Sequence, residues 1–280
     1  MQATIKFITE ELNSLYPEGE INGFIRLIME SACGLSLTQM ATEQLQEIST
    51  DGRARITEIV ERLKKYEPIQ YILGETEFFG LRFNVNPSVM IPRQETEELV
   101  DWVLKTNPGN GIHVCDIGTG SGCIAISLKK NRRDLKVTAF DISEDAIVIA
   151  GENAVRNHVE INFLCKDILK PEGLNGTDYE IIVSNPPYVR ESEKILMSRN
   201  VLDYEPGSAI FVPDSDPLRY YRFISLFASE KLLTGGFLFL EINEALENET
   251  VSLLNSRFCN IEVRNDLNGK PRMIKAQKPE

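Results

Sequence analysis

The sequence has little of what a disulfide framework, a metal centre or a membrane span requires. Its five cysteines are scattered, with no pair separated by two residues, and its only histidines are His113 and His158. We therefore expect no structural disulfide and no bound metal. No apolar run approaches the roughly 18 residues of a membrane-spanning helix, and the N-terminus lacks the layout of a signal peptide. A cytoplasmic protein without membrane contact is the expectation.

Positive charge is also scarce. There are 30 Lys and Arg residues against 42 Asp and Glu, which gives a formal net charge of −12. Affinity for duplex nucleic acid comes largely from basic side chains that neutralise phosphates, so this balance argues against stable nucleic-acid binding. The 280 residues, 42% of them apolar, are enough for one sizeable globular domain and a small one.

The first two regions of the chain carry no recognisable chemistry. In residues 1–67 apolar side chains recur at helical spacing, which predicts a small helical domain for packing or for docking a partner. Its expected helices cover residues 3–16, 20–33 and 51–66, with Asp51 as the N-cap of the last. Residues 68–92 are rich in aromatic and β-branched residues, interrupted by turn-forming glycines, and favour a hairpin connector.

Residues 93–280 alternate apolar strands with helices, after a first helix from about 96 to 105. This alternation predicts an α/β domain with a doubly wound, mostly parallel sheet covered on both faces. The expected strands are 112–117, 136–141, 161–165, 179–184 and 236–242, with two short ones after them, and the expected helices are 123–130, 143–157, 218–233 and 244–256. Ligands bind such sheets at the carboxyl ends of the strands, so the residues that follow the strands are the first candidates for a site.

A glycine-rich loop follows the first of these strands. It reads Gly118-Thr119-Gly120-Ser121-Gly122 and leads into a helix. Its spacing departs from the GxGxxG of dinucleotide sites, and Asp141 ends the next strand, about 20 residues on, where an acidic residue accepts hydrogen bonds from ribose hydroxyls. We predict that these residues bind S-adenosylmethionine, with Asp116 near its sulfonium cation. Glycines that serve only a tight turn are the alternative.

The third strand is followed by Asp167 and Ile168. In this architecture Asp167 is expected to accept from the adenine amino group, and Ile168 to pack on the adenine ring. A solvated loop aspartate is almost as consistent with the local sequence.

The segment Asn185-Pro186-Pro187-Tyr188 leaves the carboxyl end of the strand at 179–184. Two prolines fix the backbone and remove two donors, so the Asn185 side-chain oxygen and the Pro186 carbonyl remain as rigid acceptors. Such a pair can hold both hydrogens of a planar NH2 group, aim its nitrogen at a methyl group and stabilise the positive charge that develops. We predict methyl transfer to such a group, with Asn185, Pro186 and Tyr188 catalytic, all four residues binding the substrate, and Asn185 also touching the cofactor. A proline turn that merely ends the strand is the alternative.

Three further segments complete a resemblance, namely Pro68–Gly74, Ile91–Glu97 and Tyr204-Glu205-Pro206. With the glycine loop and Asn-Pro-Pro-Tyr, they resemble the protein-glutamine methyltransferases of the HemK/PrmC type, which modify peptide chain release factors. The resemblance implies that S-adenosylmethionine is the methyl donor and S-adenosylhomocysteine the product. It also implies that the substrate is the glutamine of the Gly-Gly-Gln tip of class-one release factors, and that the N-terminal helices dock that protein.

Two positions depart from the family pattern. Gln94 stands where a proline is common, and Glu241 is followed by Ile242-Asn243 in place of His-Gly. Asn-Pro-Pro-Tyr is shared with adenine methyltransferases of nucleic acids, so such an enzyme is the alternative activity. A catalytically idle scaffold that grips a partner is a third interpretation.

Overall fold

The computed structural model of the chain describes residues 1–34, 48–106, 109–170 and 178–280. By their internal packing these residues form two units. One contains Met1–Gly74 together with Ser198–Tyr204, and the other contains Glu75–Met197 and Glu205–Glu280. The predicted division into regions 1–67, 68–92 and 93–280 assigned a role to each region, and it stays a prediction.

The first unit is helical. Its helices are α1 (Gln2–Leu12), α2 (Glu18–Cys33), α4 (Thr50–Leu63), α5 (Ile69–Leu73) and α9 (Arg199–Tyr204). Buried side chains from the first four, among them Leu12, Ile28 and Ile59, form its core. The α9 segment belongs to it through the Tyr204 hydroxyl, which donates to the Lys65 carbonyl oxygen at 3.0 Å.

Two local expectations in this unit are wrong. The N-cap of α4 is Ser49, whose hydroxyl accepts from Gly52 N at 3.1 Å, and Asp51 lies within the first turn. Residues Ile69–Leu73, expected at the start of the hairpin connector, form helix α5 instead. Pro68 precedes this helix, and Gly74 ends it in the left-handed conformation, with φ 77°. The hairpin itself is β1 (Glu75–Phe78) paired antiparallel with β2 (Leu81–Asn84).

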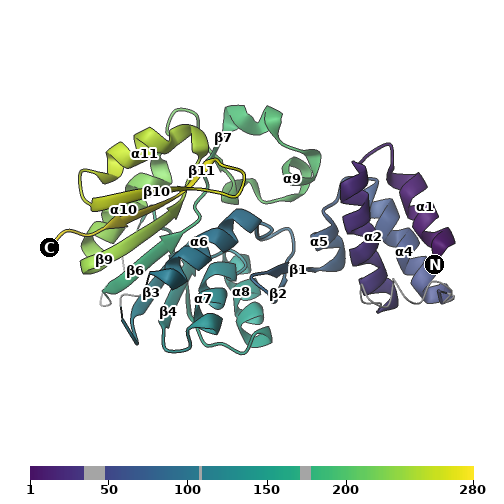
Figure 1. The fold of residues 1–280 in the computed structure, drawn as a ribbon, viewed down its shortest axis with the longest axis horizontal. Helices are drawn as coiled ribbons and strands as arrows, with labels where there is room; N and C mark the ends of the chain where they lie inside the picture. Colours follow the sequence, from purple (N-terminus) through teal and green to yellow (C-terminus); the bar gives the residue numbers. More distant parts are fainter. Residues whose placement is uncertain (35–47, 107–108, 171–177) are drawn as a thin grey trace. The chain divides into compact units, whose positions relative to one another are not determined.

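The second unit is built on a seven-stranded sheet with the order β10-β11-β9-β6-β3-β4-β5. Its strands are β3 (His113–Ile117), β4 (Lys136–Asp141), β5 (Asn162–Cys165), β6 (Tyr179–Ser184), β9 (Leu232–Glu241), β10 (Cys259–Asn265) and β11 (Pro271–Gln277). The pairs among β3, β4, β5, β6 and β9 are parallel, whereas β11 runs antiparallel to both of its neighbours. The predicted doubly wound, mostly parallel α/β sheet is thus confirmed (Figure 1).

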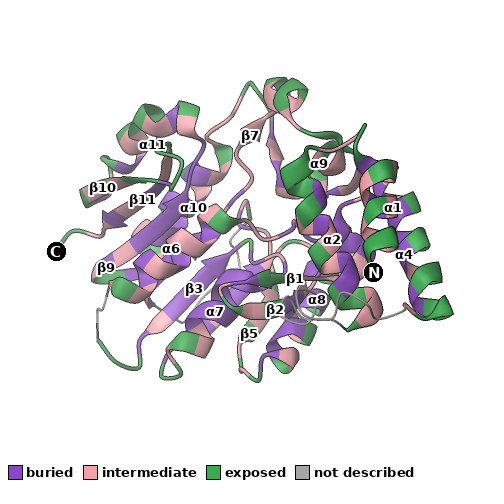
Figure 2. Cartoon of the chain, turned by 45° about the vertical axis from the view of Figure 1, so that its right-hand side comes forward, coloured by how far each residue is buried: buried purple, intermediate pink, exposed green. Residues whose placement is uncertain are grey.

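Helices cover both faces of this sheet (Figure 1). They are α6 (Gln94–Lys105), α7 (Cys123–Asn131), α8 (Glu144–Arg156), α10 (Arg219–Lys231) and α11 (Glu247–Leu254). Side chains of α6 and α7 pack into the core on one face with Val114 and Phe239, and those of α10 and α11 pack on the other with Leu238 and Leu240. Figure 2 shows the result, with buried strands between helices whose outer faces are exposed.

The predicted elements of the sheet domain are largely confirmed. Strands β4 and β6 begin and end at the predicted residues, and Ser143 caps α8 by accepting from Ala146 N at 3.2 Å. The helix expected at 244–256 is divided into a 3-10 turn, Glu244–Leu246, and α11. The short parallel strands β7 (Val189–Arg190) and β8 (Phe211–Val212) were not predicted, because two-residue strands leave no periodicity to detect.

The topology also fixes where a ligand can bind. Strand β3 has β4 on one side and β6 on the other, so the connections diverge at its carboxyl end. The Ser184 hydroxyl donates to the Ile117 carbonyl oxygen at 2.7 Å and ties the ends of β6 and β3 together. Within the described residues, no helix is long and apolar enough to cross a membrane.

Candidate active site

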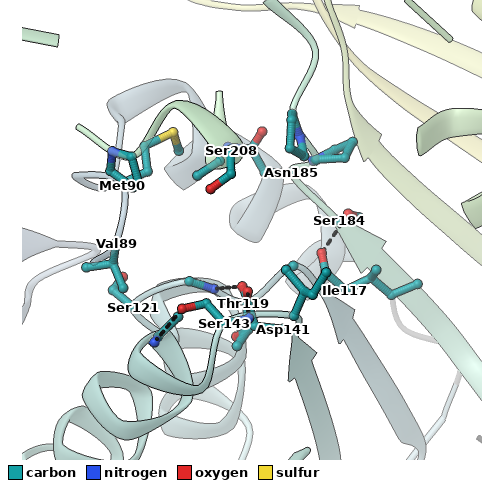
Figure 3. Close-up of a pocket in the computed structure, with 18 of the residues that line it drawn as sticks. Val89, Met90, Ile117, Thr119, Ser121, Asp141, Ser143, Ser184, Asn185 and Ser208 are labelled. Atoms are coloured by element: carbon teal, nitrogen blue, oxygen red, sulfur yellow. Dashed lines mark hydrogen bonds between the residues drawn. The ribbon is translucent and has the colours of Figure 1, made fainter. Parts of the chain in front are cut away.

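A cavity of about 390 Å³ opens at the carboxyl ends of β3, β4 and β6. This volume lies within the usual range of small-molecule sites. Its wall includes Gly118 to Ser121 of the glycine loop, Asp141 to Ser143, Asp167 and Ile168, Asn185 to Pro187, the segment 87–90 and residues 206, 208 and 209. Figure 3 shows Asp141 and Thr119 on one side of it, with Asn185 and Ser208 on the other. The predicted cofactor and substrate residues therefore meet in one cavity, apart from Gly122 and Tyr188.

The glycine loop turns sharply between β3 and α7. Gly118, Gly120 and Gly122 all have positive φ, at 72°, 53° and 81°. A Cβ on Gly118 or Gly120 would meet no atom within 4 Å, so a ligand can approach their backbone there. A Cβ on Gly122 would instead lie 2.9 Å from Ile126 Cδ1 and 3.2 Å from Ala150 Cβ, so this glycine allows α7 and α8 to pack closely. Thr119 and Ser121 line the cavity between the glycines.

Asp141 connects the loop to the end of β4. Its Oδ2 accepts from Gly120 N at 2.9 Å, and its Oδ1 accepts from Ser143 N at 3.0 Å. Burial raises the pKa of this carboxyl, while these backbone donors oppose the rise. Each oxygen has a further lone pair, so the carboxylate can also accept from the hydroxyls of a ribose.

Asp116 does not have the expected role. Its side chain is fully buried and does not belong to the cavity wall, so it cannot face a sulfonium there. Its Oδ2 accepts from the Thr119 hydroxyl at 2.7 Å and from Ala125 N at 3.2 Å, which holds the loop against the start of α7. Burial raises its pKa to about 7. Side chains alternate along a strand, and Asp116 shares the face of β3 with Val114, beneath α7.

The next candidates, Asp167 and Ile168, both line the cavity. The Asp167 carboxylate accepts from Leu169 N at 2.8 Å, which shapes the turn after β5. Ile168 is 8% exposed and packs in the core beneath that turn. Their contact with an adenine ring stays a prediction, and Tyr220, from α10, is an aromatic neighbour in the same wall that the sequence did not indicate.

Asn185, Pro186 and Pro187 line the cavity, but Tyr188 does not belong to its described wall. The Tyr188 hydroxyl donates to Glu241 Oε1 at 2.8 Å, and its ring packs with the core between the sheet and α10. Burial and the Glu241 carboxylate raise the pKa of Tyr188 well above its ordinary value. In this arrangement the Tyr188 ring packs on the core side of the segment Asn185 to Pro187. Stacking of Tyr188 on a substrate stays a prediction.

The sequence missed two buried polar residues next to Asn185. Asn185 Nδ2 donates to Thr96 Oγ1 at 3.1 Å, and Thr96 Oγ1 donates to Glu241 Oε2 at 2.7 Å. Thr96 lies in the first turn of α6, and Glu241 is the last residue of β9. The only available signal was the family resemblance, which contained both residues without showing that they touch.

Glu205 joins two walls of the cavity. Its carboxylate accepts from Ile91 N at 3.1 Å and forms an ion pair with Arg93. The Glu205 side chain is 1% exposed, and that of Arg93 is 35% exposed. This residue thereby fixes the segment containing Met90 and Pro92 against the segment containing Pro206 and Ser208, all of which line the cavity.

The residues present fit S-adenosylmethionine. The open backbone at Gly118 and Gly120 would hold the amino-acid end, and Asp141 would accept from the ribose hydroxyls. Asp167 and apolar side chains of the same wall would surround the adenine. Among the described residues, no group of three or more His, Cys, Asp or Glu side chains is placed to hold a metal ion.

Two family models match the chain. The Methyltransferase small domain matches residues 95–202, and the PrmC N-terminal domain matches residues 5–74. A solved methyltransferase from Pyrococcus furiosus shares the fold, with a TM-score of 0.54 and 19% identity over 83% of this chain and all of that one.

Two relatives carry the same name, release factor glutamine methyltransferase. The protein of Bacteroides thetaiotaomicron is 43% identical over 99% of this chain and 100% of its own length. That of Flavobacterium psychrophilum is 45% identical over 95% of both chains. Identity of this level over nearly the whole length confirms the resemblance found in the motifs. The chain belongs to the release factor glutamine methyltransferase family.

Proposed function

We propose that this protein transfers a methyl group from S-adenosylmethionine to the side-chain amide nitrogen of a glutamine. The observation that carries the proposal is one cavity with Asn185 and Pro186 on one wall and the glycine loop with Asp141 on another. The substrate is the glutamine of the Gly-Gly-Gln tip of class-one peptide chain release factors, as the names of the relatives indicate. Because that substrate acts in translation, we propose the cytoplasm as the location.

The methyl transfer needs little more than an oriented substrate NH2 group and nearby oxygens that stabilise the positive charge developing on its nitrogen. S-adenosylmethionine, when bound, supplies an electrophilic methyl group on a sulfonium. Asn185 Oδ1 and the Pro186 carbonyl oxygen accept the two hydrogens of the substrate NH2 and hold its nitrogen toward that methyl group. The same oxygens stabilise the positive charge that develops on nitrogen. No strong general base is required, because the product amide loses its extra proton to solvent after transfer.

Docking of the release factor is proposed for the helical unit. None of its described residues lines the cavity, and the PrmC N-terminal domain model matches it over residues 5–74. Helices α1, α2 and α4 of this unit keep many polar side chains on their exposed faces. The net charge of −12 disfavours the alternative of a nucleic-acid adenine methyltransferase.

The test is incubation with labelled S-adenosylmethionine and either a class-one release factor, or adenine-containing DNA or RNA. We expect one methyl group per release factor, located by mass spectrometry on the glutamine of Gly-Gly-Gln. A release factor whose Gly-Gly-Gln glutamine is replaced by alanine is the matched control and should stay unlabelled. Label on nucleic acid alone would overturn the proposal in favour of the adenine methyltransferase.

A further inference from the structure

Three side chains from distant parts of the sequence form a hydrogen-bonded row behind the cavity. Asn185, after β6, donates to Thr96 of α6, which donates to Glu241 at the end of β9. Thr96 is 2% exposed and Glu241 is 1% exposed. Of the three, Asn185 and Thr96 line the cavity and Glu241 does not. Among these three residues, Glu241 is connected to the cavity through Thr96.

The number of hydrogens sets the direction of this row. An ionised carboxylate only accepts hydrogen bonds, and a threonine hydroxyl has one hydrogen to donate. Since Thr96 gives its hydrogen to Glu241, its oxygen can only accept from Asn185, and the Asn185 atom that faces it must be Nδ2. The Asn185 oxygen is then left for a substrate in the cavity, as the acceptor that a planar NH2 group needs.

Burial raises the pKa of Glu241, but three groups around it favour the ionised form that this argument needs. Its Oε2 accepts from Thr96 and its Oε1 from the Tyr188 hydroxyl, at 2.7 and 2.8 Å. The Arg272 guanidinium lies near enough to favour the charged form as well. Burial and the charge of Glu95 raise the pKa of Glu241, and these three groups oppose that rise.

We propose that Thr96 and Glu241 are positioning residues that fix the Asn185 carboxamide with its oxygen toward the substrate. A carboxamide free to rotate by half a turn presents its NH2 group instead, and that donor would meet the donor of the substrate. The row thus removes the unproductive orientation before substrate arrives, which is preorganisation of an electrostatic contact. This proposal rests on the proposed function, since it assumes an NH2 substrate.

The first test is Thr96→Val, which keeps the shape of the side chain and removes the hydroxyl. We expect kcat on a release factor to fall by about 10- to 100-fold, less than the roughly 10²- to 10³-fold for a lost catalytic hydrogen bond, because Thr96 acts through Asn185. The dissociation constant of S-adenosylmethionine, measured by calorimetry, should stay within about threefold. Thr96→Ser restores the hydroxyl and should recover most of kcat, which a purely packing role for the methyl group would not allow.

The matched control is Thr250→Val. Thr250 is fully buried on α11, and its hydroxyl donates to the Leu246 carbonyl oxygen at 2.7 Å, away from the cavity. Its loss should lower stability without changing kcat. Equal kcat in wild type and Thr96→Val would overturn the proposal.

Glu241→Gln is a second variant, should Thr96→Val fold poorly. A glutamine offers one acceptor and one donor where the carboxylate offers two acceptors, so either the Thr96 or the Tyr188 hydroxyl must reverse. When Thr96 reverses, Asn185 turns its NH2 group to the cavity, and we expect about a tenfold lower kcat with unchanged cofactor affinity. A Glu241→Gln variant in which the Asn185 side-chain NH2 signals shift but kcat stays at the wild-type value contradicts the proposal.

One measurement separates this proposal from the proposed function. With 15N-labelled asparagine, the Asn185 side-chain NH2 signals are identified by their loss in Asn185→Ala. Independently of any substrate, we expect Thr96→Val to shift one of them and speed its exchange with solvent. Unchanged signals would overturn the row, whereas a wild-type protein that leaves the release factor unmodified would overturn the proposed function alone.

Discussion

The cavity has a cofactor half, formed by the glycine loop and Asp141, and a substrate half, formed by Asn185, Thr96 and the two segments that Glu205 joins. The two halves are held together in different ways. In the cofactor half, Gly120 N bonds to Asp141 over a separation of 21 residues, and the Thr119 hydroxyl bonds to Asp116 over three. In the substrate half, Asn185 bonds to Thr96 over 89 residues, Thr96 to Glu241 over 145, and Ile91 to Glu205 over 114. The cofactor half is thus shaped within one strand–helix–strand segment, whereas the substrate half requires α6 and the ends of β6 and β9, which are far apart in the sequence, to be in place.

The largest expected effect is that of Asn185→Ala, which should disable the substrate half and spare the cofactor half. We expect kcat on the release factor to fall by about 10²- to 10³-fold, as for other preorganised catalytic hydrogen bonds. The dissociation constant of S-adenosylmethionine should change by less than about tenfold. Single-turnover kinetics and calorimetry measure the two quantities. Unchanged turnover would show that Asn185 does not hold the NH2 group.

Asp141→Ala should have the opposite pattern. The change removes the proposed ribose acceptor and leaves Gly120 N and Ser143 N without their partner. We expect cofactor affinity to fall by about 30- to 100-fold, the usual cost of losing a charged hydrogen bond in a partly buried site. Turnover at saturating cofactor should change far less. A variant with normal cofactor affinity and low turnover would remove the distinction between the two halves.

The sequence predicted the cofactor half better than the substrate half, because the contacts that shape the cofactor half join residues close together in the sequence. Strand β4 ends at Asp141 as predicted, because an apolar run followed by a polar residue is a local signal. The bond between Thr96 and Glu241 has no such signal, since it depends on α6 packing against β9. Even locally, the sequence did not show on which face of β3 the Asp116 side chain lies, and this side chain, expected near the sulfonium, is buried outside the described cavity wall.

Glu205→Ala tests the wall of the substrate half. The change leaves Ile91 N without its acceptor and Arg93 without its charge partner. Because Arg93 is partly exposed and can be solvated, we expect a loss of about 1–2 kcal/mol in the free energy of unfolding. The KM for the release factor should rise while cofactor affinity holds. Asp101→Ala, which breaks the exposed pair with Lys105, is the control and should change neither quantity. Weaker cofactor binding in Glu205→Ala would show that the halves are not separable.

Asp116→Asn alters no ligand contact and should have the smallest effect on activity. The asparagine oxygen can still accept from the Thr119 hydroxyl and from Ala125 N, so the loop should keep its shape. The change should instead appear in the pH dependence of stability. The pKa of Asp116 is 3.8 in a model peptide and about 7 in the folded protein. Between these values the unfolded chain releases the proton and the folded chain keeps it.

The wild type therefore loses stability as pH rises through that window, and the loss is complete above about pH 7. One proton contributes at most about 1.4 kcal/mol per pH unit. Asparagine does not titrate, so the free energy of unfolding of Asp116→Asn relative to wild type should rise between pH 4.5 and 7 (roughly the titration window). Urea denaturation at several pH values measures it. Parallel pH profiles would show that Asp116 is already ionised in the folded protein, and that the cofactor half contains a buried negative charge beneath its glycine loop.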